Sequence, residues 1–227
     1  MPGRATRAAA VLLVLGALAY TAWLLEVLVG TGLDPVRTYV SELAAADQPL
    51  GGLFRATDLA AGLLVLAGAL TGLAATHRPR RRRPWALGGW IALAVFGAAT
   101  AADSQLPLSC APTADPECAA RETAGLVPAT HMAHAVSSSL AMTGAVAAMV
   151  ALTVAARRYG DWRPLARTGP ALVVLQLAAT AWTLAAVAAF ETGRGTWALG
   201  VGQRLQVLLV AVWLVVLAGS LARRRAR

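Results

Sequence analysis

Residues 53–102 read LFRATDLAAGLLVLAGALTGLAATHRPRRRRPWALGGWIALAVFGAATAA, and this stretch decides the fold. Two apolar runs, 53–76 and 85–102, flank the segment HRPRRRRP, in which five of eight residues are arginine. A hydrocarbon core about 30 Å thick requires roughly 20 apolar residues of helix. The two runs are therefore predicted to cross a membrane as a helical hairpin, with the arginines left in water on one side.

Four further stretches have the same length and apolar character, namely residues 8–30, 129–156, 170–190 and 201–222. Only 14% of the 227 residues are charged, about half the share of a soluble domain, and 58% are hydrophobic. The sequence thus predicts an all-α integral membrane bundle of six transmembrane helices, forming a single membrane domain over residues 1–227. The same composition disfavours a soluble enzyme, a disordered chain and a secreted disulfide scaffold.

The first apolar stretch also has features of a secretory signal peptide, because Arg4 and Arg7 precede an apolar core. The apolar run continues through Trp23 to Gly30, which is long enough to span a membrane. We therefore interpret it as the first transmembrane helix.

The arginines are distributed unevenly between the two predicted sides of the membrane. Both termini and alternate linkers hold fifteen of the twenty, whereas five lie on the opposite side: Arg37, Arg55, Arg121, Arg194 and Arg204. Cytoplasmic loops of membrane proteins carry an excess of basic residues. The distribution predicts a multi-pass protein of the plasma (cytoplasmic) membrane with its N and C termini in the cytoplasm.

The arginine run at 77–84 has two interpretations. Clustered basic residues bind nucleic acid in many proteins. Between two spanning helices, however, they are expected to contact anionic lipids at the cytoplasmic surface. The predicted partner is the lipid bilayer, with anionic lipids at the cytoplasmic arginine clusters. Nucleic acid is not a predicted partner. The sequence does not indicate a particular protein partner.

Cys110 and Cys118 lie together in the longest outer linker. The space outside the cytoplasmic membrane is oxidising, so a local disulfide bond is predicted. A zinc site that combines these cysteines with His131 and His134 is the alternative.

Polar and charged residues recur at one depth, near the outer ends of five predicted helices. Ionisable groups inside a bilayer are costly and usually face the bundle interior, so each is a candidate functional group. This outer polar cluster consists of Glu26, Arg55, Asp58, Asp103, Ser104, His131, His134, Ser138, Glu191 and Arg204. A short interfacial helix is predicted from Val36 to Ala46, in the first outer loop, and it adds Ser41 and Glu42 to the cluster.

His131 and His134 are three residues apart and share a helix face. Together with Asp103 or Asp58 from another helix, they would make a zinc site. Zinc would make a bound water nucleophilic at neutral pH, with Asp58 and Asp103 as the candidate catalytic carboxylates. The alternatives are hydrogen bonds from the histidines to Asp103, Ser104 or lipid headgroups, and a proton-coupled role.

Two arginines need partners at the same depth. Arg55 is three residues from Asp58, and an internal ion pair is the simple expectation. Arg204 has Asp58, Glu191 and Glu26 as equally placed candidate counter-ions.

Three tracts carry a family resemblance. YVSELAAADQPLGGLFRATDLAAGLL (39–64), ADSQLPLSCAPTADPEC (102–118) and HMAHAVSS (131–138) resemble a bacterial polytopic membrane family filed as domain of unknown function nine-nine-eight. The similarity covers about residues 8–220. It implies a compact six-helix integral membrane protein and no established reaction.

Three functions are compatible with these patterns. Because no catalytic motif is complete, the favoured one is a non-enzymatic envelope module, such as a sensor, an assembly factor or an accessory subunit, with an outward-facing polar cluster. The others are an outward-facing, metal-assisted hydrolase of a lipid or envelope substrate and a proton-linked transporter.

Overall fold

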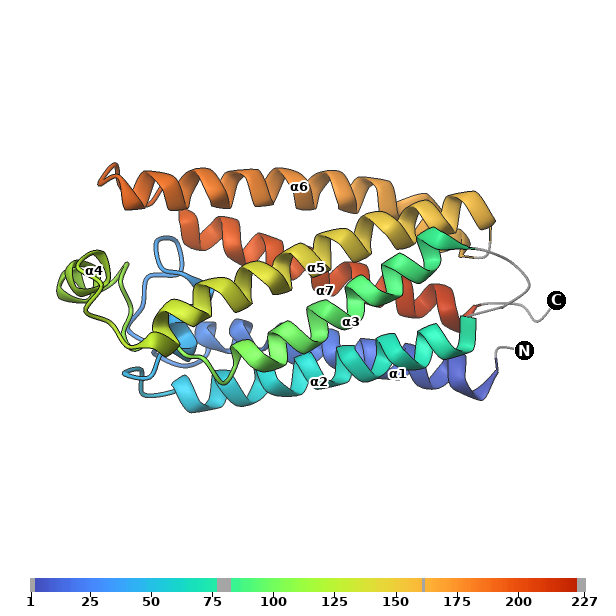
Figure 1. The fold of residues 1–227 in the computed structure, drawn as a ribbon, viewed down its shortest axis with the longest axis horizontal. Helices are drawn as coiled ribbons and strands as arrows, with labels where there is room; N and C mark the ends of the chain where they lie inside the picture. The colour runs from blue at the N-terminus through green and yellow to red at the C-terminus, as the bar shows by residue number, and fades with distance from the viewer. Residues whose placement is uncertain (1–2, 77–82, 161, 224–227) are drawn as a thin grey trace.

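The structure is a computed structural model, and it describes residues 3–76, 83–160 and 162–223. Six long helices lie side by side in an elongated bundle (Figure 1). They are α1 (Arg4–Tyr20), α2 (Gly51–Thr76), α3 (Pro84–Asp103), α5 (Ala129–Tyr159), α6 (Arg163–Glu191) and α7 (Leu199–Ala222). The connections contain the short helix α4 (Pro116–Thr123) and two 3-10 helices, η1 (Ala22–Val27) and η2 (Val40–Ala44). The described residues contain no strand.

The bundle is that of a multi-pass membrane protein. Among the residues that the structure describes, six segments are long and apolar enough to span a membrane, the first of them formed by α1 together with η1. Large apolar side chains are exposed along the helices, for example Val11, Leu70, Val174 and Val212, as expected where lipid covers the surface. The all-α fold with six spanning segments is therefore as the sequence predicted.

Three predicted boundaries differ from the structure. The first α-helix ends at Tyr20, because the Thr21 hydroxyl donates to the carbonyls of Ala17 and Leu18 and the chain continues as a 3-10 helix. The helix predicted over 170–190 begins at Arg163 and contains Pro170 in its interior, so the arginines that indicated a linker belong to its first turns.

The interfacial helix predicted over Val36–Ala46 is reduced to the 3-10 helix Val40–Ala44. Asp34 starts a turn instead, because its side chain accepts a hydrogen bond from the Val36 amide and its carbonyl accepts one from the Thr38 amide.

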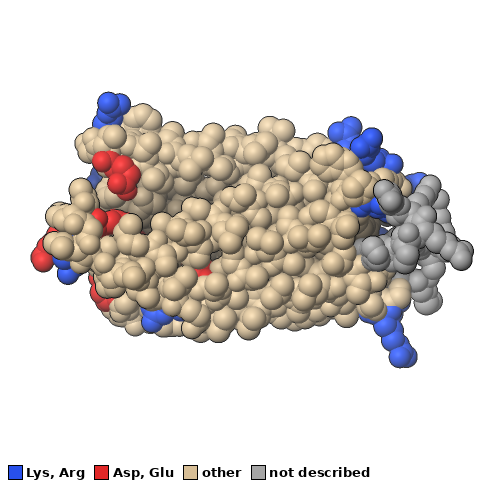
Figure 2. Space-filling model, in the orientation of Figure 1, with Lys and Arg blue, Asp and Glu red and all other residues tan. Residues whose placement is uncertain are grey.

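The two ends of the bundle differ in charge (Figure 2). We call one the arginine-rich end; its described arginines are Arg4, Arg7, Arg83, Arg157, Arg158, Arg163, Arg167 and Arg223. The other is the loop end, formed by the first loop (residues 28–50), the disulfide loop (residues 104–128) and the turn between α6 and α7. Both termini lie toward the arginine-rich end (Figure 1). Most of the predicted lipid anchor, residues 77–82, lies outside the described residues.

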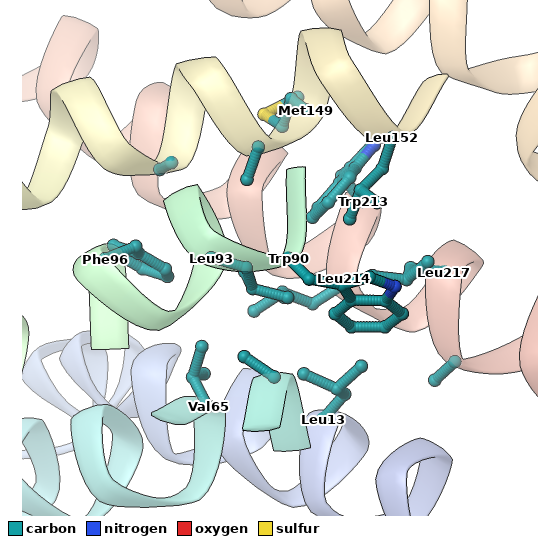
Figure 3. Packing of buried hydrophobic residues seen from close by; sticks show 14 of the residues in the cluster. Leu13, Val65, Trp90, Leu93, Phe96, Met149, Leu152, Trp213, Leu214 and Leu217 are labelled. Atoms are coloured by element: carbon teal, nitrogen blue, oxygen red, sulfur yellow. The ribbon is translucent and has the colours of Figure 1, made fainter. Parts of the chain in front are cut away.

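The helices pack in a closed ring. Each long helix contacts the next one along the chain, and α7 contacts α1. Trp90, Phe96 and Trp213 fill the interior together with Leu13, Leu152 and other residues (Figure 3). At the α2–α3 crossing, a Cβ atom on Gly62 would lie 2.4 Å from the Ala101 amide nitrogen, so the two backbones touch. Small residues at such crossings drive helix association in a bilayer.

Candidate functional site: a polar layer at the loop end

A buried ion pair fastens the first transmembrane segment to α7. The Arg204 Nε and Nη2 atoms each donate to one carboxylate oxygen of Glu26 at 2.6 Å. The side chains are only 8% and 6% exposed, and Arg204 Nη1 also donates to the carbonyls of Thr38 and Gly200. This bidentate geometry is the strongest that an arginine and a carboxylate form. Of the three predicted counter-ions of Arg204, the structure selects Glu26.

A second buried carboxylate joins the first loop to the disulfide loop. Glu42, on η2, is fully buried and accepts hydrogen bonds from the amide and the hydroxyl of Thr113. Burial raises the pKa of Glu42 to about 7, although the bonds from Thr113 act to lower it. The Ala46 amide donates to the Leu108 carbonyl beside this contact. The two loops thus form one unit, which we call the platform.

The disulfide loop is closed by the predicted bond between Cys110 and Cys118. α4 begins within the closed loop, where the Asp115 side chain caps it by accepting a hydrogen bond from the Glu117 amide. The bond brings Ser109, before the first cysteine, toward residues on α4 and at the start of α5.

His131, in the first turn of α5, contacts both the disulfide loop and α4. It is 1% exposed, and its Nδ1 atom lies 3.0 Å from the Ser109 amide nitrogen and 2.9 Å from the Ser109 Oγ atom. Its Nε2 atom lies 3.3 Å from the Glu122 Oε1 atom, close enough for an ion pair but not aligned as a hydrogen bond. A serine, a histidine and a glutamate therefore lie in a row.

His134 belongs to a separate group inside the bundle. Its Nδ1 atom is 3.1 Å from both Asp103 Oδ1 and the Leu106 carbonyl oxygen, and Ser137 donates to the same Asp103 oxygen. Asp58 on α2 interacts electrostatically with Asp103 and His134. It is half-buried, and its side chain makes no hydrogen bond within the described part of the chain.

The predicted metal ligands are thus divided between two groups. His131 is engaged by Ser109 and Glu122, whereas His134 is engaged by Asp103 and Leu106. Among residues 3–76, 83–160 and 162–223, no three His, Cys, Asp or Glu side chains are placed to hold one ion. The zinc site stays a prediction without geometric support.

The other predicted residues have structural roles or stand at the surface. Arg55 donates to the carbonyls of Ala44 and Ala45, which end η2, and not to Asp58. Ser104 and Ser138 donate to backbone carbonyls of their own helical segments, those of Ala101 and His134. Glu191 is exposed at the end of α6, and Ser41 is half-buried in η2.

A family model described as "Protein of unknown function (DUF998)" matches residues 4–220 of this chain. The chain belongs to the DUF998 family. The match spans nearly the whole described structure and agrees with the resemblance seen in the sequence. No curated protein and no solved structure matches this chain.

The contacts of this DUF998 chain that were not foreseen include three at His131 and Glu42: Thr113 with Glu42, Ser109 with His131, and Glu122 with His131. All three involve the disulfide loop, which has no periodic pattern from which a facing residue can be deduced. The adjacency of Ser109 and Thr113 to Cys110 was the available signal, because a short disulfide ring holds its neighbours in place.

Proposed function

We propose that this DUF998 protein is an envelope module that holds the platform on the outer side of the cytoplasmic membrane, in the class of sensors, assembly factors and accessory subunits. The observation that carries the proposal is that the buried charged groups at the loop end, such as Arg204 and Glu42, have partners inside the chain. Arg204 is held by Glu26 and by two carbonyls, and Glu42 is held by Thr113. Groups engaged in this way act as a scaffold for the surface above them.

Two independent features support the proposed orientation. The arginines favour a cytoplasmic location for the arginine-rich end, where anionic lipids would meet them. The disulfide bond at the loop end favours the oxidising side of the membrane. The acidic side chains visible in Figure 2 lie in the half of the molecule toward the loop end.

The polar layer supports a scaffold better than it supports zinc hydrolysis or proton transport. The two histidines use their Nδ1 atoms on different partners, which separates the candidate zinc ligands. A transport path requires polar groups that exchange partners, whereas Arg204 is held by four hydrogen bonds. Asp58 is the group that a transporter would use, so it is the residue to test.

The orientation is tested with two matched cysteine variants. Gly3 and Gly30 lie near opposite ends of the bundle, and a Cβ atom on either meets no atom within 4 Å. In a Cys110→Ser/Cys118→Ser background, a membrane-impermeant maleimide is expected to label Gly30→Cys in intact cells and Gly3→Cys only after permeabilisation. The opposite pattern overturns the proposed orientation.

The scaffold role is tested by measuring zinc content and pH-driven proton flux of purified protein in lipid vesicles. We expect no stoichiometric zinc in the wild type. We also expect that vesicles containing the wild type or Asp58→Asn show the same proton flux as vesicles without protein. Ser138→Ala is the matched control, since Ser138 bonds only within its helix. One zinc per chain, lost in His131→Ala/His134→Ala, would establish the hydrolase instead. Flux abolished in Asp58→Asn would establish the transporter.

A further inference from the structure

Ser109, Glu122 and His131 come from three segments, namely the disulfide loop before Cys110, α4 and the first turn of α5. The disulfide bond between Cys110 and Cys118 joins the first two segments, and His131 lies between them. None of the scaffold contacts described above uses Ser109 or Glu122. The row of hydroxyl, imidazole and carboxylate is therefore a feature that the platform does not explain.

The hydrogen bonds determine the direction of proton transfer along this row. The Ser109 amide can only donate, so the His131 Nδ1 atom that it contacts carries a lone pair and no proton. The Ser109 hydroxyl, 2.9 Å from the same atom, is then the donor of its bond. The imidazole proton resides on Nε2, the atom 3.3 Å from Glu122. A base that faces the hydroxyl and a carboxylate on the other side of the base have the order of groups that activates a serine, although Nδ1 and Nε2 are exchanged relative to the Ser-His-Asp triad and Glu122 is not aligned as a hydrogen bond.

We propose that Ser109 is a nucleophile, activated by His131 and Glu122, that accepts an acyl group from an amphiphilic ester at the membrane surface. The inference goes beyond the proposed scaffold and does not depend on it. Ser109 is half-buried, so part of the residue is open to a reagent at the surface.

The surroundings of the row favour a lipid-like ester. Leu126, Met132 and Val136 are more than half exposed, and Met132 and Val136 are four residues apart on one face of α5. This apolar strip begins beside the row and continues along a spanning helix, where an acyl chain would lie. Arg121 is exposed, and its Nη2 atom lies 3.6 Å from the Cys110 sulfur, so a cation for an anionic headgroup is nearby.

The acylation step needs only the ester and the three side chains of the row. A bond forms between Ser109 Oγ and the ester carbonyl carbon, and the bond from that carbon to the alcohol oxygen breaks. The Ser109 proton passes to His131 Nδ1 and then to the departing alcohol oxygen, while Glu122 stabilises the imidazolium. The amides of Cys110 and Ala111 make no hydrogen bond within the described residues, and because they directly follow Ser109 we assign them as the donors to the carbonyl oxygen as its negative charge develops. Water that attacks the acyl-serine by the reverse route releases the acid.

A fluorophosphonate probe tests the proposal on purified full-length protein in lipid vesicles, with the modified residue located by mass spectrometry. We expect one adduct, on Ser109. His131→Asn is the informative variant, because its side-chain oxygen lies near the position of Nδ1 and still accepts the Ser109 amide but is not a base. It should lower the labelling rate by roughly 10²–10⁴-fold, the usual contribution of a general base. Glu122→Gln should lower it less, and Ser138→Ala should leave it unchanged.

The wild type alone can overturn the proposal, since no adduct, or an adduct on another residue, contradicts it whatever the variants do. Equal rates in the wild type and His131→Asn, at unchanged melting temperature, would also show that the row is structural. If His131→Asn does not fold, the rate of Glu122→Gln decides in its place. The vesicle and cysteine-labelling experiments remain separate, so failure of this inference leaves the scaffold proposal standing.

Discussion

The spanning part of the bundle and its loop end are held together by different forces. Along the spanning helices the contacts are apolar and close, as where Gly62 meets the backbone of Ala101 and Trp90 packs edge-on against Trp162. At the loop end the contacts are ionic and directional, as between Arg204 and Glu26. Lipid offers no hydrophobic drive between helices, so packing of small residues joins them there. Loop backbone is not paired within helices, so at the loop end side chains such as those of Arg55 and Arg204 bond some of its carbonyls.

Removal of the Arg204 side chain is expected to destabilise the loop end more than any other change described below. Arg204→Met leaves the Glu26 carboxylate buried and unpaired, which typically lowers the free energy of unfolding by about 3–5 kcal/mol. The measurement is unfolding in a detergent titration, followed by circular dichroism. The double variant Glu26→Met/Arg204→Met should lose much less. If both variants lost the same free energy of unfolding, the ion pair would not be what stabilises the loop end.

The dependence of stability on pH separates the two regions further. The pKa of Glu42 rises from 4.5 to about 7 on folding, so the folded state holds a proton that the unfolded state releases. The stabilising contribution of Glu42 is therefore fully present below about pH 4.5 and falls by about 1.4 kcal/mol per pH unit until about pH 7. Glu42→Gln, which keeps an acceptor for the Thr113 amide, should remove this slope. A slope that persists in Glu42→Gln would assign it to another group.

The smallest expected effect concerns the spanning part. Gly62→Ala places a methyl group against the α3 backbone, and such overpacking typically lowers the free energy of unfolding by about 1–3 kcal/mol. Gly88→Ala on α3 is the matched control, because its methyl group would meet no atom within 4 Å. Equal melting temperatures for the two variants would show that the α2–α3 crossing is not closely packed. Neither variant should alter the pH slope that Glu42 produces.

Several features were predictable because they depend on composition and local spacing. Six apolar runs indicated six spanning segments, and two cysteines in one outer linker indicated their disulfide bond. Helix ends were predicted less well. Thr21 ends α1 early through its own hydroxyl, and Arg163 begins α6 seven residues before its apolar run.

The sequence predicted the depth at which the polar residues of the candidate site lie, but not which of them contact one another. Sequence alone indicated that Glu26, Glu42, His131 and Arg204 lie near the loop end, because each stands near the end of an apolar run or in the first outer loop. It left Arg204 with three equal counter-ions, and it left open whether the two histidines share a metal ion, form hydrogen bonds to Asp103, Ser104 or headgroups, or handle protons. The structure assigns Glu26 to Arg204 and gives the histidines different partners.

The sequence by itself determined the helix count, the family, the disulfide bond and the charge difference between the ends. These follow from the thickness of a bilayer, from the closeness of the two cysteines in the sequence and from the order of residues along one chain. Only the tertiary structure decided that Thr113 meets Glu42 and that Ser109 meets His131. Those contacts join loops to distant helices, and in a loop without periodicity the direction of a side chain is set by the closure of the whole bundle.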